Sequence, residues 1–109
     1  MNTGRPMMLL RARTRADVRE EFDRWFDTVQ KENVRSIPGI ARVLSGRANG
    51  GTRLGIYLFD SAEAVQPALS SPQAAYTRGT WQRWQADMEE MSIELWAGVV
   101  TMSMYEEIN

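Results

Sequence analysis

The residues that could do chemistry in this chain are amides, aromatic rings and arginines, since its 109 residues include no His and no Cys. An imidazole base, a thiolate nucleophile and the usual ligands of zinc, iron and haem are therefore missing. Gln30 and Asn33 follow Phe26 by one and about two helical turns. Their amides could bind a substrate carbonyl or phenolate. Equally, Gln30 could bond a strand carbonyl and Asn33 could cap the helix end.

Aromatic side chains are numerous for a chain of this length, and they could wall a pocket for a planar apolar ligand. Core packing explains Trp25 and Trp84 better than a pocket does, because large aromatic residues at helical spacing are mostly buried. Trp81, Trp96 and Tyr57 fit a core and a pocket wall equally well. The candidate ligand-contacting residues are Trp25, Phe26, Tyr57, Tyr76, Trp81 and Trp96.

Arginines at strand positions form a second group of candidates, because Arg11, Arg13 and Arg42 lie among apolar neighbours. A guanidinium in such surroundings needs a carboxylate or an anionic ligand. A salt bridge within a dimer and a contact with a substrate oxyanion are equally open for them. We select Arg42, together with Gln30 and Asn33, as the candidate catalytic set, and we expect no metal site.

Composition excludes several functions. Lys and Arg total 13 against 14 for Asp and Glu, so no net field would gather nucleic acid or an anionic membrane. Residues 1–8 contain no sustained apolar stretch, which argues against a secretory signal and a membrane span. The lack of Cys suits a reducing compartment, so the cytoplasm is the expected location. A hydrophobic share of 43% fits one globular domain over residues 1–109.

The first half of the chain predicts a strand, a helix and a hairpin. Residues 6–12 are a short apolar run typical of a buried strand. Apolar residues then recur at helical spacing from residue 15 to about residue 35 and include Phe22 and Val29. The helix ends at residues 36–39, where Pro38 disfavours helix before it. Two extended runs joined by Asn49-Gly50-Gly51 follow, over 40–48 and 52–60, and predict a hairpin.

The second half predicts a broken helix and a last strand. Residues 60–63 resemble a cap, Pro67 limits that helix, and Pro72 allows a fresh start at a first helical position. The main helix is expected to carry one apolar face made of Trp81, Trp84, Met88 and Met91. Residues 92–105 predict the last strand, and residues 106–109 a frayed or exchanging tail.

The resulting order is βαββαβ, a ferredoxin-like α+β fold. Two right-handed crossovers place both helices on one face of a four-stranded antiparallel sheet. The strands are nevertheless apolar on both faces; for example, Met7 and Leu9 alternate with Met8 and Leu10. Because a lone protomer would expose apolar area beyond a few hundred Å², we expect a homodimer that covers the second face, as in a dimeric α+β barrel.

The first helix and its exit resemble the EthD-like branch of the dimeric α+β barrel superfamily. The resemblance rests on Trp25-Phe26, on Ile37-Pro38-Gly39-Ile40 and on Gly79-Thr80-Trp81. Members show a Trp-Tyr or Trp-Phe pair, a His four positions after the aromatic partner, and a Val/Ile-Pro-Gly-Phe turn. The superfamily includes cofactor-free oxygenases, polyketide cyclases, lactone isomerases and haem-handling enzymes. Gln30 stands at the position of the His, so a His-based mechanism does not carry over.

The leading functional hypothesis is a cofactor-independent enzyme acting on an apolar, aromatic or polyketide-like natural-product intermediate. Cyclisation or isomerisation ranks first, in a pocket between the sheet and the helices, with Gln30, Asn33 and Arg42 polarising a carbonyl. One alternative is a cofactor-free monooxygenase of an antibiotic pathway. Another is a non-catalytic dimeric protein that binds a small apolar ligand, which the missing His favours.

Overall fold

The structure is a computed structural model that describes residues 4–99, and it contains the predicted four-stranded antiparallel sheet. The strands lie in the order β2-β3-β1-β4. The first and last strands, β1 and β4, are therefore neighbours in the sheet although they are far apart in the sequence. Their bounds are β1 (Arg5–Thr14), β2 (Ile40–Arg47), β3 (Arg53–Phe59) and β4 (Met88–Val99). The ferredoxin-like α+β fold is therefore confirmed.

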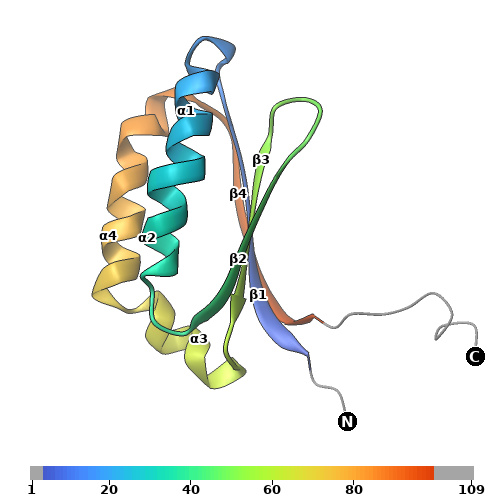
Figure 1. Ribbon diagram of the computed structural model, residues 1–109, viewed down its shortest axis with the longest axis vertical. Helices are drawn as coiled ribbons and strands as arrows, with labels where there is room; N and C mark the ends of the chain where they lie inside the picture. Colours follow the sequence, from blue (N-terminus) through green and yellow to red (C-terminus); the bar gives the residue numbers. More distant parts are fainter. Residues whose placement is uncertain (1–3, 100–109) are drawn as a thin grey trace, which may run out of the picture.

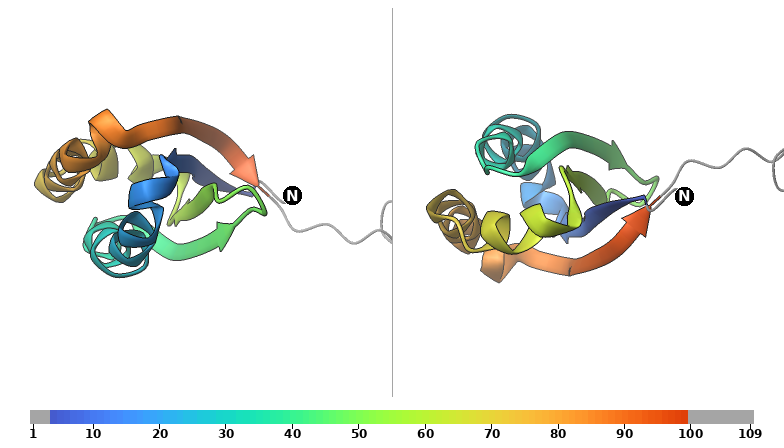
Figure 2. Two further views of the ribbon diagram at one scale, coloured as in Figure 1. Left: turned by 90° about the horizontal axis from the view of Figure 1, so that it is seen from above. Right: turned by 90° about the horizontal axis from the view of Figure 1, so that it is seen from below.

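The helices cover one face of this sheet, and the other face is open (Figures 1 and 2). A short 3-10 turn, η1, precedes the first helix, which runs as α1, the π-helical turn η2 and α2. Their bounds are η1 (Ala16–Val18), α1 (Arg19–Trp25), η2 (Phe26–Gln30), α2 (Lys31–Arg35), α3 (Ala62–Leu69), α4 (Pro72–Thr80) and the 3-10 segment η3 (Trp81–Asp87). None of these described helices is long and apolar enough to cross a membrane.

The second helical region is broken as predicted, and each piece has its own cap. The Ser61 hydroxyl accepts a hydrogen bond from the backbone N–H of Ala64 at 3.2 Å, and the Ser71 hydroxyl accepts one from that of Ala74 at 3.1 Å. The expected helical face at Met88 and Met91 is wrong, because β4 begins at Met88 and both residues pair with β1. The predicted strand and tail beyond residue 99 lie outside the described residues.

Strand register assigns each side chain to one face of the sheet. On β1 and β3, Leu10, Ala12, Tyr57 and Phe59 face the helices and are buried. The alternate residues face the open side and are half-buried; the central strands contribute Met7, Leu9, Leu54, Ile56 and Leu58 to it. Both faces of the sheet are thus apolar, as the sequence predicts.

An aromatic cluster joins the first helix to η3. Phe22 is 1% exposed and contacts four other rings at centroid distances of 5.2 to 5.9 Å. Trp25 and Trp81 meet edge to face at 5.0 Å, a geometry that aromatic pairs favour. The cluster fixes the position of Trp81 relative to the first helix.

A buried arginine ties the hairpin to the first helix. The Arg53 side chain is 5% exposed, forms an ion pair with Asp23 at 3.4 Å and another with Asp27 at 2.5 Å, and lies over the Phe26 ring. The hydrogen bond from Arg53 holds the pKa of the Asp27 carboxyl below its usual range, although desolvation opposes this. Burial lowers the pKa of Arg53, yet its two carboxylate partners raise it overall. The group therefore persists as a charged cluster.

Asp27→Asn should lower the free energy of unfolding by about 1–2 kcal/mol near pH 7, because Arg53 keeps only Asp23 as a partner. A carboxyl with a depressed folded-state pKa stabilises the fold above its unfolded pKa, and this contribution is lost as pH falls through the folded pKa. The difference between wild type and variant should therefore shrink in urea unfolding below about pH 4. Asp17→Asn, at an exposed pair with Arg15, is the control. A difference that persists near pH 2 would contradict this assignment.

Candidate functional site

A cavity of about 510 Å³ lies between the sheet and the helices. It separates the two buried clusters of the core, one around Phe22 and Trp84 and one around Ile37 and Phe59. Its size is that of a pocket for a drug-sized ligand. The lining is mainly apolar and consists of Met8, Leu10, Gln30, Val34, Ile37, Ile40, Tyr57, Phe59, Leu69, Ala74, Thr77, Arg78, Trp81, Met91, Ile93 and Leu95.

Gln30 is the buried amide in the wall of this cavity, with 3% exposure. The indole N–H of Trp81 donates a hydrogen bond to Gln30 Oε1 at 3.0 Å. Because an indole nitrogen can only donate, this contact fixes which end of the amide is oxygen. The amide nitrogen of Gln30 is thereby left to donate to another group, and Trp81 acts as the side chain that orients it.

The π-helical turn η2 brings Gln30 to the inner face of the helix. In a regular α-helix, Val29 would point within about 20° of Phe22, and Gln30 about 80° away. In the structure, Val29 is 44% exposed and Gln30 is buried. A π turn closes over more residues than an α turn, so it rotates successive side chains less. The sequence prediction that Val29 belongs to the apolar stripe is therefore wrong, since η2 exchanges it for Gln30.

Tyr57 forms the part of the cavity wall that comes from the sheet. Burial raises the pKa of its phenol, and the nearby Gln30 amide offsets part of that rise, so the phenol keeps its proton at neutral pH. Within residues 4–99 its hydroxyl has no partner in hydrogen-bonding geometry, which places the Gln30 amide near it but not bonded to it. A Cβ at Gly55 would lie 2.7 Å from Tyr57 Cζ. The missing side chain at Gly55 therefore makes room for the tyrosine.

A second, smaller cavity of about 90 Å³ lies on the other side of Gln30 and Tyr57. Its lining includes Asp27, Lys31 and Ser45 beside apolar residues, so its walls are partly polar. A polar space of this size accommodates a few water molecules. Gln30 and Tyr57 thus stand between an apolar cavity for a ligand and a small polar one.

Of the predicted site residues, the structure brings Gln30, Tyr57 and Trp81 together around the larger cavity. Trp25 is instead buried among Phe22, Trp81 and Trp84, and Phe26 lies under Arg53, so neither lines it. Asn33 does not line it either. The Asn33 carbonyl accepts from Thr77 at 3.4 Å and from Ser36 at 2.6 Å, while its side-chain nitrogen is buried without a partner in the described chain.

Three further predictions are wrong about the direction in which the side chain points. Arg42 pairs with Leu58, whose side chain faces the open side of the sheet, so it points away from the cavity. Trp96 pairs with Met7 on that same side and is 48% exposed. Tyr76 is 68% exposed because Ala74 and Thr77 are the residues that α4 turns inward. None of these three residues can contact a ligand held between the sheet and the helices.

Sequence reasoning missed two groups of lining residues. Arg78 lies three residues before Trp81, a spacing that places both on one side of a helix. Met91, Ile93 and Leu95 alternate along β4 and face the helix layer. The helical spacing from Trp81 could have indicated Arg78, whereas the β4 residues required the correct start of that strand.

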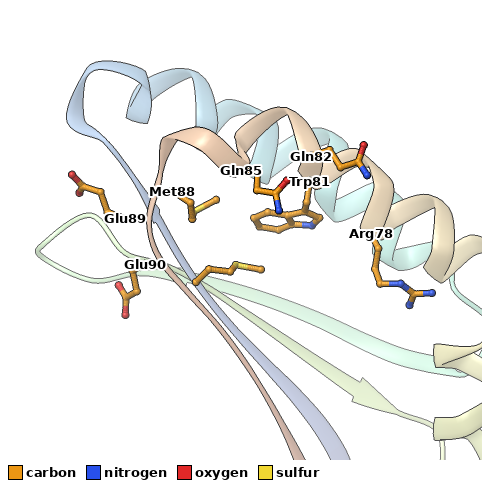
Figure 3. Close-up of a pocket in the computed structure, with 8 residues that line it drawn as sticks. Arg78, Trp81, Gln82, Gln85, Met88, Glu89 and Glu90 are labelled. Atoms are coloured by element: carbon orange, nitrogen blue, oxygen red, sulfur yellow. The ribbon is translucent and has the colours of Figure 1, made fainter.

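A groove of about 560 Å³ continues from the cavity between α4, η3 and the start of β4. Figure 3 shows Arg78 and Trp81 extending from the helix towards the sheet, whereas the side chains of Glu89 and Glu90, at the start of β4, point away from these two residues. Arg78, Trp81 and Met91 line both spaces, so the groove adjoins the cavity, and we call it the mouth of the cavity.

The lining of the cavity determines what it can do chemically. Among the residues of the described chain that line it, Arg78 is the charged one, and none is an Asp or a Glu. The side chains that can hydrogen-bond a ligand there are Gln30, Thr77 and Arg78, since the Tyr57 hydroxyl is itself buried. Such a site can hold a flat apolar molecule and donate hydrogen bonds to one of its oxygens, but it offers no ordinary base.

No family model matches this sequence, and no curated protein matches it either. Solved structures do share its fold. Rv0793 from Mycobacterium tuberculosis matches with a TM-score of 0.69 at 16% identity, over 92% of this chain and 100% of that chain. SnoaB, a cofactor-independent oxygenase from Streptomyces nogalater, matches with a TM-score of 0.67 at 16% identity, over 91% and 97%.

An ethyl tert-butyl ether d (EthD) family protein from Bacillus halodurans also matches, with a TM-score of 0.62 at 14% identity, over 82% of this chain and 96% of that chain. The chain is thus a ferredoxin-like α+β protein with an apolar cavity between its sheet and its helices. In fold it resembles the EthD-like proteins, as the first helix and its exit suggest, while identities this low carry the fold and not the function.

Proposed function

We propose that this chain is a cofactor-independent enzyme that binds a flat, apolar, aromatic or polyketide-like carbonyl compound and stabilises its enolate. The observation that carries the proposal is the buried Gln30 amide, which Trp81 holds at 3.0 Å by its oxygen; among residues 4–99 its nitrogen has no hydrogen-bond acceptor. A pre-oriented donor beside a developing oxyanion stabilises the charge without reorganisation. The Tyr57 ring lines the cavity beside this amide.

An enolate is the intermediate that cyclisation, isomerisation and oxygenation without a cofactor have in common. SnoaB, which shares this fold, is a cofactor-independent oxygenase, so the fold is compatible with this class of chemistry. The proton leaves to water, because none of the described residues that line the cavity is an Asp or a Glu. The substrate must therefore be acidic beside its carbonyl, as polyketide-like 1,3-dicarbonyl compounds and benzylic ketones are.

A second candidate function is a non-catalytic carrier of the same kind of ligand. The absence of a base among the residues that line the described cavity favours it, because proton transfer usually needs a positioned acid or base. In either function, the lack of Cys supports the cytoplasm as the proposed location.

Deuterium exchange at the carbons beside the carbonyl of 2-tetralone, followed by NMR in D₂O, tests the enzyme proposal without knowledge of the natural substrate. The wild type should accelerate exchange over buffer, and Gln30→Leu should reduce the acceleration by about 10- to 100-fold. Trp81→Phe keeps an aromatic wall but removes the N–H that orients Gln30, so it should cause a smaller loss.

Gln73→Leu changes an exposed glutamine of α4 outside the cavity and is the matched control. It should leave the exchange rate unchanged. If 2-tetralone binds, as shown by quenching of tryptophan fluorescence, but exchanges no faster than in buffer, the carrier function is correct and the enzyme proposal is wrong.

We also propose that the protein is a homodimer whose protomers pack by the open faces of their sheets. That face carries the half-buried residues of β1 and β3 together with Leu44 and Trp96, which are 36% and 48% exposed. Arg42 and Glu94 lie on the same face, so their opposite charges could pair across a two-fold axis. A second copy of the chain presents the same apolar face, with the same two charged residues.

Ile56→Asp should convert the dimer to monomers, because it places a charge near the centre of the apolar open face. Analytical ultracentrifugation should find the wild type at twice the 12.4 kDa mass of the chain and the variant at that mass. Val29→Asp, on the exposed side of the first helix, should leave the dimer intact. A wild type that sediments as a monomer would exclude this interface.

A further inference from the structure

The acidic side chains at the mouth of the cavity have ion-pair partners, whereas the arginine there has none among the described residues. Glu89 and Glu90 lie on the strand side of the mouth, and both carboxylates are already engaged. Glu90 accepts from Thr52 at 2.6 Å and pairs with Arg13 at 3.4 Å. Glu89 pairs with Arg13 at 3.4 Å and with Arg19 at 3.5 Å. The acidic wall of the groove is thus neutralised by residues outside it.

Arg78, on the helix side of the same mouth, has no such partner. Among residues 4–99 it forms no ion pair, and its Nη1 donates to the backbone carbonyl of Leu69 at 3.2 Å. This bond holds the guanidinium at the entrance, where it lines both the cavity and the groove. Its remaining N–H groups are suited to a carboxylate, since guanidinium and carboxylate form paired hydrogen bonds.

The interior beyond Arg78 is apolar and lined on one side by Trp81 (Figure 3). A ligand that fills it and reaches the mouth would place one end beside this guanidinium. We propose that the natural ligand is amphipathic, with a flat apolar body in the cavity and a carboxylate at its outer end bound by Arg78. This inference rests on the proposed function and adds the class of ligand and its direction: carboxylate outwards and carbonyl towards Gln30.

Two fluorescent probes of one shape test the inference, anthracene-2-carboxylate and its neutral counterpart anthracene-2-carboxamide. The wild type should bind the carboxylate at least about fivefold more tightly at low ionic strength, and added salt should reduce this preference. Arg78→Gln should equalise the two affinities while leaving that of the carboxamide unchanged. Because Arg78 is exposed, the variant should fold normally.

Arg83→Gln is the matched control. Arg83 lies in η3, the segment that follows α4, but it pairs with Glu21 at 2.9 Å and stacks on Trp84, outside both spaces. It should leave both affinities unchanged. Equal binding of the two probes by the wild type, or a preference that survives Arg78→Gln, would overturn the inference and leave the proposed function standing. Failure of both probes to bind the wild type would overturn both.

Discussion

Phe22→Ala should lower the free energy of unfolding by about 3–5 kcal/mol, the range found when a buried ring is removed from a core. The reason is specific to this position. Phe22 is 1% exposed and touches Trp25, Phe26, Trp81 and Trp84, and rigid rings cannot collapse into the space that it leaves. Such a loss is a large share of the total stability of a small protein. Urea unfolding followed by circular dichroism, at one protein concentration, measures it.

Two valines of the same helix supply a matched control. Val34 is 2% exposed and Val29 is 44% exposed, although their substitution by alanine removes the same atoms. Val34→Ala should cost about 1–2 kcal/mol, whereas Val29→Ala should cost less than about 0.5 kcal/mol. Equal losses would contradict the π-helical turn that leaves Val29 exposed, and a loss below about 1 kcal/mol for Phe22→Ala would contradict the aromatic cluster.

The fold could be predicted because its signals are local and strong. Alternating or continuous apolar runs bounded by turns identify strands, and the hairpin at residues 49–51 needs a residue with positive φ. Gly51 has φ +93° there, and Gly39, at the exit of the first helix, has φ +94°. The start of β4 was missed because Trp81, Trp84, Met88 and Met91 continue a helical spacing, while the chain pairs with β1 from Met88 onwards.

The site was predicted only in part, because it depends on small departures from regular geometry. Ile40 faces the helices, and simple alternation would turn Arg42 the same way. A β-bulge between Ile40 and Arg42 adds one residue to the strand and shifts the alternation of side chains between the two faces. Arg42 therefore faces the open side of the sheet. The π turn acts similarly on Gln30, which it moves from the edge of the helix face to its centre. Neither departure leaves a signature in the residue types.

Gly55→Ala should both destabilise the protein and damage the cavity, because the added Cβ would lie 2.7 Å from Tyr57 Cζ and closer still to the hydroxyl oxygen. The tyrosine is 3% exposed, so its ring has to tilt off the strand towards the cavity that it lines. Overpacking of this kind costs about 1–3 kcal/mol. Binding of 2-tetralone, measured by quenching of tryptophan fluorescence, should weaken on the order of tenfold, which corresponds to about 1.4 kcal/mol.

Gly46→Ala separates this clash from the general effect of replacing a strand glycine. The nearest atoms to a Cβ at Gly46 belong to Leu54 at 3.8 Å, an ordinary contact, so the variant should stay within about 0.5 kcal/mol of the wild type. If the clash with the ring is the cause, Tyr57→Leu should cost less in the Gly55→Ala background than alone, since neighbouring substitutions that share a contact are not additive. Additive losses, or equal losses for the two glycines, would show that Gly55 does not set the position of Tyr57. The cavity wall would then depend on the helices, and the room that Gly55 leaves would have no part in shaping the site.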